Sequence, residues 1–345
     1  GKVYYMIKDL TTGLWSEEAM VTIYLTRVRH RIFNPNGLRV RINAVGNQFM
    51  ALDTFQFEAP NHFFEAPAYS GKNTIYNSSL WIAGRDVDGH IHSACERMRK
   101  GKLPFASQVA WDFWTGPVMN HEEYTPQYLV DHNRLWYITR EDILYHIQHS
   151  QDPGYYPGAR IRNWPANGYP ALGSASVLAP FHDVNQNNAY DPVNGDFPAI
   201  KGDEAVYFIF NDEYGEHKES RGRKLGIEVQ GMAYGFSCED DSAFHNTLFV
   251  RYNVINRSDT IYHSVYIGNY THFAIGTPDD YLACDTLLNA FYAYNQDGYD
   301  DSTSLFYPSY GEHPPAQAVV LLNRPMDHFM CFHYAYPFVD TLFNW

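Results

Sequence analysis

One stretch decides the fold class of this chain: Ala205-Val206-Tyr207-Phe208-Ile209-Phe210, which ends at Asn211-Asp212. A short run of β-branched and aromatic residues, closed by turn-forming residues, predicts a β-strand. Further runs of this kind follow at residues 225–236, 246–256, 261–267 and 318–322. Because only the polar turn Arg257-Ser258-Asp259-Thr260 separates the second and third of them, we expect those two to pair as a β-hairpin.

Another hairpin is predicted in the first half of the chain. The turn Asp86-Val87-Asp88-Gly89 lies between apolar runs at residues 80–84 and 90–92, and Asp-Gly between such runs is a strong hairpin signal. The segment from Glu17 to Arg29 is ambiguous. Its start favours a helix, whereas Val21-Thr22-Ile23-Tyr24-Leu25 is β-branched enough to favour a strand.

One helix is predicted near the middle of the chain. Thr139-Arg140-Glu141-Asp142 fits a capping box, which opens a helix that runs to about residue 150. Ile143 and Ile147 share one face of this helix. The helix also carries His146 and a second histidine three residues further on. Since no acidic third ligand is evident, we expect surface histidines here rather than a transition-metal site.

The order of these elements predicts a mainly β protein with one or few short helices. Many short strands separated by long Pro/Gly/Asn-rich loops, mainly at 151–200 and 295–317, favour a β-sandwich-like body with calcium-stapled loops. We expect an N-terminal segment over 1–34, helix or strand, and a single large β-rich module over 35–345. That module is expected to continue beyond its C-terminus, and a subdivision near 150–175 is an alternative.

The composition excludes several classes of protein. The chain has 345 residues and a net charge of −14, which argues against nucleic-acid binding because that needs a basic surface. It contains no run of 18 apolar residues, so no transmembrane helix is expected. The four cysteines include no C-x-x-C pair, which makes a cysteine zinc site improbable. They leave three disulfide pairings, or free buried thiols, open.

The strongest chemical signal is an acidic loop that begins at Asp183. Oxygen-bearing side chains stand at loop positions 1, 3, 5 and 9, and a backbone carbonyl stands at position 7, as in an EF-hand-type calcium loop. These positions are Asp183, Asn185, Asn187, Asp191 and, for the carbonyl, Ala189. Asn188 stands where that loop type has glycine, and asparagine tolerates the left-handed conformation needed there.

Two further carboxylates could complete this calcium site, because position 12 of the loop holds no glutamate. They are Asp196, which follows a glycine turn, and Asp203. The alternative is a loop of Asx turns in which Asp and Asn side chains cap their own backbone. Calcium is favoured because three carboxylates in a short stretch repel one another without a cation. A second calcium site is predicted from Asp279, Asp280 and Asp285.

A glycan-binding module or a carbohydrate-active enzyme is the alternative function. The aromatic motifs Trp111-Asp112-Phe113-Trp114 and Asn163-Trp164-Pro165 could stack on sugars if they face solvent. Paired carboxylates for glycoside hydrolysis depend on a separation that only the fold sets. The acidic residues here cluster in turn-like stretches, which suits cations better than general acid–base catalysis.

Several further motifs follow one another in a fixed order along the chain. They include Ser79-Leu80-Trp81-Ile82-Ala83-Gly84, Asp112-Phe113-Trp114-Thr115-Gly116-Pro117, Asn163-Trp164-Pro165-Ala166, Ala179-Pro180-Phe181, Asn194-Gly195-Asp196-Phe197-Pro198 and Cys284-Asp285-Thr286. Their order resembles that in a family of large secreted surface proteins of the Bacteroidota. Members of this family often end in a C-terminal sorting domain for type IX secretion. The resemblance covers about residues 35–325 and implies export to the cell surface, without an established enzymatic activity.

The sequence therefore leads to one expected function and one alternative. We expect a non-enzymatic extracellular protein with structural calcium sites that acts in cell-surface structure, adhesion or envelope assembly. Its expected partners are other surface or envelope proteins, or surface glycans, and an oligomer or filament would fit this role. Extracellular calcium is plentiful enough to fill weak sites with dissociation constants of about 10⁻⁴–10⁻³ M.

Overall fold

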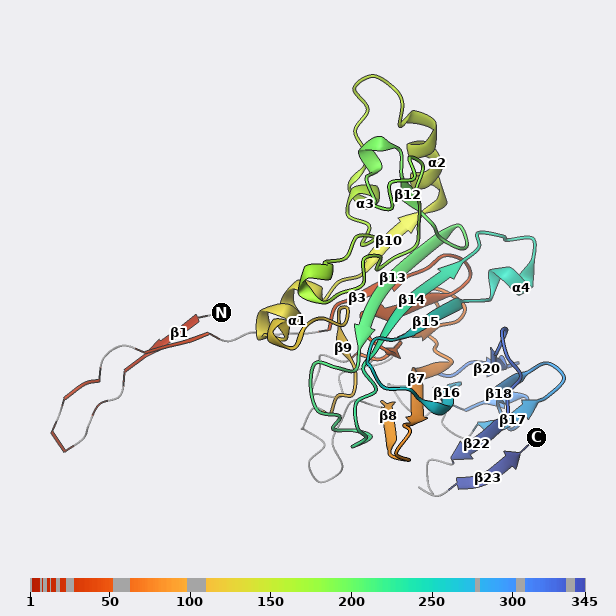
Figure 1. Ribbon diagram of the computed structural model, residues 1–345. Coiled ribbons are helices and arrows are strands. Elements are labelled where there is room, and N and C mark those ends of the chain that lie inside the picture. Colours follow the sequence, from red (N-terminus) through yellow and green to blue (C-terminus); the bar gives the residue numbers. More distant parts are fainter. Residues whose placement is uncertain are drawn as a thin grey trace.

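The computed structural model describes residues 2–6, 8, 11–12, 14–16, 19–22, 28–51, 63–97, 110–276, 280–301, 308–332 and 339–344. The prediction of a mainly β protein is confirmed, with antiparallel sheets stacked in layers (Figure 1). Among the described residues, no helix has the length and the apolar character needed to cross a bilayer.

The largest sheet, which we call sheet 1, is built around the predicted strand at 205–210. Its strands are β10 (Trp136–Thr139), β13 (Glu204–Asn211), β14 (Ile227–Gly235) and β15 (Phe249–Asn256), in that spatial order, with β9 (Trp114–Thr115) paired to the end of β13. All of these pairs are antiparallel. The strands predicted at 225–236 and 246–256 are thus confirmed as β14 and β15.

Strand β13 is buried on both faces, and this divides the core in two. Val206, Phe208 and Phe210 face the main core, while Ala205 and Ile209 face a second, smaller core. Alternate side chains of a strand point to opposite faces, so a continuous apolar run signals a strand covered on both sides. Sheet 1 therefore carries one layer of structure on each face.

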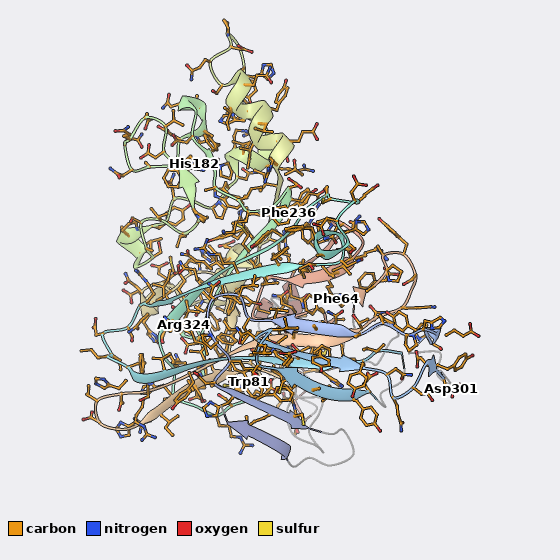
Figure 2. All side chains as sticks on the ribbon, turned by 90° about the vertical axis from the view of Figure 1, so that its right-hand side faces the viewer. Phe64, Trp81, His182, Phe236, Asp301 and Arg324 are labelled. Carbon is orange, nitrogen blue, oxygen red and sulfur yellow. The ribbon has the colours of Figure 1, made fainter. Side chains whose placement is uncertain are left out.

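The layer that covers the main core contains a second sheet, which we call sheet 2. Its strands are β16 (His263–Phe273), β7 (Ile75–Arg85) and β5 (Asn47–Gln48) in that order, with β8 (Ile91–Cys95) also paired to β7. The sheet of β3 (His30–Phe33), β4 (Arg39–Asn43) and β6 (Phe64–Glu65) lies in the same cluster of buried residues. Figure 2 shows Phe64 and Trp81 on the side of sheet 1 opposite His182. A sandwich-like body is consistent with this arrangement.

One predicted hairpin is confirmed and the other is wrong. Strands β7 and β8 pair around the Asp86–Gly89 turn, as predicted. Strands β15 and β16 do not pair with each other, because β15 joins β14 in sheet 1 and β16 joins β7 in sheet 2. The connection crosses between the layers, where Arg257 N donates to Gly226 O (2.9 Å) and the Tyr262 hydroxyl donates to Leu225 O (2.8 Å).

The remaining elements are short. Strands outside the sheets above are β1 (Lys2–Tyr5), β2 (Ala19–Thr22), β11 (Phe181–His182), β12 (Phe197–Pro198), β17 (Tyr281–Asp285), β18 (Ala290–Tyr294), β19 (Tyr299–Asp300), β20 (Gly311–Glu312), β21 (Gln317–Val320), β22 (His328–Phe332) and β23 (Val339–Asn344). The helical elements are η1 (His121–Glu123), α1 (Pro126–His132), α2 (Arg140–His149), α3 (Ala159–Arg162), η2 (Pro170–Leu172), η3 (Pro192–Asn194) and α4 (Ser242–His245). The strand predicted at 318–322 corresponds to β21.

The N-terminal segment differs from its predicted boundary. Ala19–Thr22 is a strand that pairs with β1, and this hairpin extends away from the body (Figure 1). Residues 17–18 and 23–27 of the ambiguous segment lie outside the described residues. Strand β3 pairs with β4, so residues 30–33 belong to the body and a boundary at residue 34 is too late.

The predicted helix is confirmed as α2, although its buried face differs from the prediction. Ile143 and His146 are buried, whereas Ile147 is 44% exposed. Helix α2 packs with α3, β10 and β12 against the second core. The alternative subdivision predicted at 150–175 falls within this region of the chain. We call residues 140–200 the loop lobe; it rises from sheet 1 at the top of Figure 1.

Removal of the α2 cap is expected to cost about 1 kcal/mol of stability. Thr139 Oγ1 accepts from Asp142 N (3.0 Å), and Asp142 Oδ2 accepts from Thr139 N (3.1 Å), so both halves of the capping box are present. Thr139→Ala leaves Asp142 N without that partner. Urea unfolding of this variant would measure the loss, with the exposed helix position Gln148→Ala as control. Equal midpoints for the two variants would contradict the role of the cap.

Candidate metal centre

The acidic loop, residues 183–196, lies in the loop lobe between the two short strands β11 and β12. These strands pair antiparallel and so close the loop at its base. Asn188 has a φ of +62°, which confirms the left-handed conformation predicted at the glycine position. Gln186 has a φ of +60° as well, so the loop curls tightly through two left-handed residues.

Three asparagine side chains meet at the Asp191 carboxylate. Its Oδ2 accepts from the Nδ2 atoms of Asn194 (2.8 Å), Asn187 (2.9 Å) and Asn185 (3.2 Å). Each amide also carries an oxygen on the same carbon, and rotation by half a turn presents that oxygen instead. The ends of four side chains that can each offer an oxygen ligand therefore lie about as far apart as two ligands of the same metal ion.

The carboxyl groups of Asp191 and Asp196 interact directly, although both carry negative charge when ionised. Burial raises the pKa of Asp196, and the Asp191 carboxylate adds to that rise. The amide of Asn194, first among several bonds, lowers the pKa of Asp191. Asp196 Oδ1 and Oδ2 accept from Val184 N (2.8 Å) and Asp191 N (2.9 Å), which holds the buried carboxyl in place. Two neighbouring carboxylates repel each other when both are ionised, and a proton or a metal cation relieves that repulsion.

Asp183 occupies the other side of the loop. Its Oδ1 accepts from Asn187 N (3.2 Å) and its Oδ2 from Asn188 N (2.7 Å). Ala189 N donates to Asn187 Oδ1 (2.8 Å), and Ala189 itself is exposed. The carboxylate oxygens of Asp183, Asp191 and Asp196 do not all lie within 4.8 Å of one another. In this arrangement the loop also satisfies itself through Asx-type bonds, which was the alternative interpretation.

The loop is anchored by residues that its sequence pattern did not reveal. His146 Nε2 lies 3.0 Å from Asp196 O, and its Nδ1 lies 3.1 Å from the Tyr155 hydroxyl. Asn167 exchanges two hydrogen bonds of 2.8 Å with the backbone of Tyr190. The expectation that His146 is a surface histidine is wrong, because it is fully buried beneath the loop. Burial lowers the pKa of His146, which favours a neutral ring that donates from Nε2. The spacing was the available sequence signal for this burial, because His146 stands three residues after the buried Ile143 and so shares its face of the helix.

The donor set fits calcium better than a transition metal. The side-chain atoms that could bind a metal at Asp191 and around it are carboxylate or amide oxygens. Hard cations such as Ca²⁺ take oxygen ligands. Asp191, Asp196, Asn185 and Asn187, with Asp183, are the residues that would hold the ion. A cation there would offset the repulsion between the neighbouring carboxylates of Asp191 and Asp196.

Asp203 is not brought to this loop. Its Oδ1 lies 3.2 Å from Arg140 Nε, and its Oδ2 accepts from Ser237 N (3.0 Å). Asp196 contacts the same helix at His146, six residues further along, which is about 9 Å at 1.5 Å per residue. Asp203 therefore fastens the start of α2 to sheet 1 and does not complete the calcium ligands as predicted.

The second predicted calcium group is not assembled. Asp279 lies outside the described residues. Asp280 immediately precedes the extended strand β17 and Asp285 ends it, which places them roughly 16 Å apart at about 3.3 Å per residue. Asp280 Oδ2 accepts from Ile275 N (2.9 Å), and Asp285 Oδ1 caps the following turn through Leu287 N (2.8 Å) and Leu288 N (3.0 Å).

A different cluster lies at the β7–β8 turn. One ligand atom each from Asp86, Asp88 and His90 falls within 4.8 Å of the others. Asp86 Oδ1 accepts from Asp88 N (3.0 Å) and His90 N (2.8 Å), while Oδ2 lies 3.1 Å from His90 Nδ1 and 3.2 Å from His92 Nε2. Burial raises the pKa of Asp86, but these bonds outweigh it and hold the pKa well below its usual value. The carboxylate thus shapes the turn.

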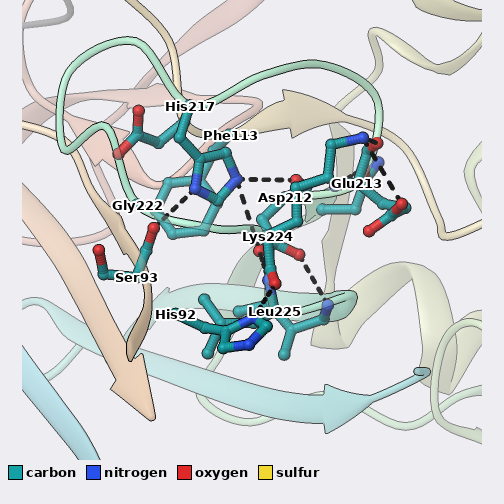
Figure 3. A network of polar contacts seen from close by, with 12 residues as sticks. His92, Ser93, Phe113, Asp212, Glu213, His217, Gly222, Lys224 and Leu225 are labelled. Carbon is teal, nitrogen blue, oxygen red and sulfur yellow. Dashed lines mark hydrogen bonds and ion pairs between the residues drawn. The ribbon is translucent and has the colours of Figure 1, made fainter. Parts of the chain in front are cut away.

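A buried Asp–His pair lies where the loop after β13 meets sheet 2 (Figure 3). His217 Nδ1 lies 2.6 Å from Ser93 O and its Nε2 lies 2.9 Å from Asp212 O. Both contacts are to backbone carbonyl oxygens, so the ring bridges strand β8 and the loop after β13. The Asp212 carboxylate lies 3.5 Å from Nε2. Ser93 contributes its backbone oxygen and not its hydroxyl, so the three residues are not arranged as a nucleophilic Ser-His-Asp triad.

The tryptophans of the two aromatic motifs lie mostly in the interior. Trp114 is 6% exposed beneath Tyr214 and His217, and Trp164 is 4% exposed with its Nε1 donating to Pro180 O (2.9 Å). Trp111 is half-buried. The glycan alternative therefore loses two of the aromatic platforms on which it was based.

The chain was compared with models of known protein families, with curated proteins and with solved structures, and none of the three comparisons finds a match.

Proposed function

We propose that this chain is an extracellular structural protein whose acidic loop is stabilised by Ca²⁺. The observation that carries the proposal is the convergence of three asparagine side chains on the Asp191 carboxylate, beside the Asp196 carboxyl that accepts from Asp191 N. The buried His146 and the exposed Asn167 join this loop to the rest of the lobe. A cation there would stabilise the loop lobe and need take no part in a reaction.

The proposal includes export to the cell surface, by a type IX-like route, and a role in adhesion or envelope assembly. Support comes from the motif order that resembles secreted surface proteins of the Bacteroidota, and from millimolar extracellular calcium, which suits weak sites. Calorimetric titration of EDTA-treated protein with CaCl₂ tests the calcium part directly. One bound ion per chain is expected in the wild type and none in Asp191→Ala. A wild type that binds no calcium would overturn this part.

Strand β16 supports the assembly role. In the described part of the chain it pairs with β7 alone, which leaves its other edge open. The strand contains no Asp, Glu, Lys or Arg, and Val265, Tyr266 and Ile267 are 52%, 64% and 60% exposed. Natural proteins usually protect such edges with charge, so an uncharged apolar edge strand marks a surface for pairing with another chain.

A lysine on this edge is expected to suppress self-association. Ile267→Lys places a charge on the open strand, whereas Val130→Lys makes the same change at an exposed apolar position of helix α1. Sedimentation velocity over a concentration series should show oligomers for the wild type and for Val130→Lys, and mainly monomer for Ile267→Lys. A wild type that stays monomeric throughout the series would contradict a role of β16 in assembly.

A further inference from the structure

Cys284 lies on β17 and Cys331 on β22, and both are free thiols in this structure. Cys284, on β17, stands directly opposite Phe291 of β18. Directly opposite residues of an antiparallel pair share one face of the sheet, with Cβ atoms about 4.5–5.5 Å apart. Phe291 is buried, so Cys284 borders the same buried face.

Strand β22 reaches that face through Phe329. The ring of this residue lies 6.0 Å from the ring of Phe291. Cys331 follows Phe329 by two residues and points to the same side of β22, while Met330 between them is 47% exposed. Cys284 and Cys331 therefore flank one aromatic contact, and both pack on the main core.

The electrostatics of Cys284 agree with this placement. Burial raises the pKa of the Cys284 thiol, and nearby Cys331 raises it further. The other two cysteines lie elsewhere in the fold. Cys95 Sγ is 3.8 Å from Ile82 O within sheet 2, and Cys238 follows the end of β14. Of the three pairings that the sequence leaves open, the fold favours the one that contains Cys284 with Cys331.

We propose that Cys284 and Cys331 form a disulfide bond that ties β17 to the β22–β23 hairpin. The two thiols lose two protons and two electrons, and one S–S bond forms. The oxidant is a disulfide, such as that of glutathione, whose own S–S bond breaks and takes up the protons and electrons as two thiols. The inference rests on the proposed function in one respect, since export to an oxidising compartment supplies such an oxidant.

The bond would close a long loop that contains β18 and β21. A cross-link across a long loop restricts the unfolded chain strongly, so it raises stability more than a short one. This would fix the three-stranded sheet of β17, β18 and β21 against the hairpin near the C-terminal end (Figure 1).

The test is oxidation of the purified full chain with oxidised glutathione in the presence of EDTA. Thiol titration in denaturant should fall from four groups to two, and non-reducing peptide mapping should recover the peptides of Cys284 and Cys331 joined. Cys95→Ser and Cys238→Ser should still form the bond, whereas Cys284→Ser and Cys331→Ser should not. Oxidation should raise the melting temperature of the wild type by several degrees and leave that of Cys284→Ser unchanged.

Four free thiols after oxidation, or a cross-link between any other pair, would overturn the proposal. Because EDTA is present throughout, the result does not depend on calcium. A bond that forms in a protein without calcium affinity would contradict the proposed function alone. A calcium-dependent protein that retains four thiols would contradict the disulfide alone.

Discussion

Removal of calcium is expected to lower the melting temperature of this protein by roughly 2–4 °C. At 10 mM free Ca²⁺, a site with a dissociation constant of about 10⁻⁴–10⁻³ M adds about 1.4–2.7 kcal/mol to the folded state by mass action. Asp183→Ala should lose part of this gain, and Asp191→Ala nearly all of it, because Asp191 is where the loop side chains converge. Differential scanning calorimetry in CaCl₂ and in EDTA measures the difference.

The matched control is Asp152→Ala. Asp152 lies just beyond α2 and is paired with His149 at 2.7 Å, outside the acidic loop. This variant should keep the full calcium response. If wild-type melts coincide in CaCl₂ and EDTA, and the purified protein contains no calcium, the acidic loop is a self-capped Asx loop and the carboxylates need another role.

The calcium response should also depend on pH in a defined direction. The folded-state pKa of Asp196 is raised by burial and by Asp191. Without metal, this group therefore contributes less stability as pH rises from the unfolded value, about 3.9, through the folded pKa. A bound cation needs the ionised carboxylate, so the stabilisation by calcium should be small at pH 4 and full at pH 7.5. The same calorimetric scans at both values check this sign.

Asp212→Ala is expected to destabilise the protein more than the loss of calcium or of the α2 cap, by about 3–5 kcal/mol. The Asp212 carboxylate accepts from Leu225 N (2.5 Å) and Ile227 N (2.7 Å) and lies 3.5 Å from the buried His217 ring. Alanine would leave the two buried N–H groups without an acceptor and would remove the carboxylate beside His217. The free energy of unfolding from urea titration measures the loss.

Glu213→Ala is the matched control for this substitution. Glu213 is the next residue and pairs with Lys224 at 3.5 Å, but both side chains are about one-third exposed. An ion pair of this kind contributes less than about 1 kcal/mol. If Asp212→Ala and Glu213→Ala unfold at the same urea concentration, the buried pair does not hold the loop after β13 to sheet 2.

The buried carboxyl group of Asp212 leads to a prediction of how the stability of the protein changes with pH. Burial raises its pKa to about 6, although His217 and the N–H groups of Leu225 and Ile227 oppose the rise. Because the folded pKa lies above the unfolded value, this group's contribution to stability falls as pH increases from about 4 to 6. Asp212→Asn should remove that slope, which denaturation midpoints between pH 4 and 7 would reveal.

The candidate site was only partly predictable from its spacing. The pattern Asp183-x-Asn185-x-Asn187 correctly indicated a tight loop with left-handed Asn188, because turn chemistry acts over a few residues. It could not indicate that Asp203 would pair with Arg140, or that Asp280 and Asp285 would be separated by the length of a strand. Those outcomes depend on which distant elements pack together.

The sequence by itself determined the local elements of this protein: the apolar run of β13, the capped start of α2 and the Asp-Gly hairpin of β7 and β8. Each follows from propensities and hydrogen bonds within about ten residues. Only the tertiary structure decided that β16 leaves β15 for β7, because strand pairing depends on contacts between residues far apart in the chain. The same long-range packing buries His146 and brings Cys284 near Cys331, since burial is a property of the assembled layers and not of a residue's neighbours in sequence.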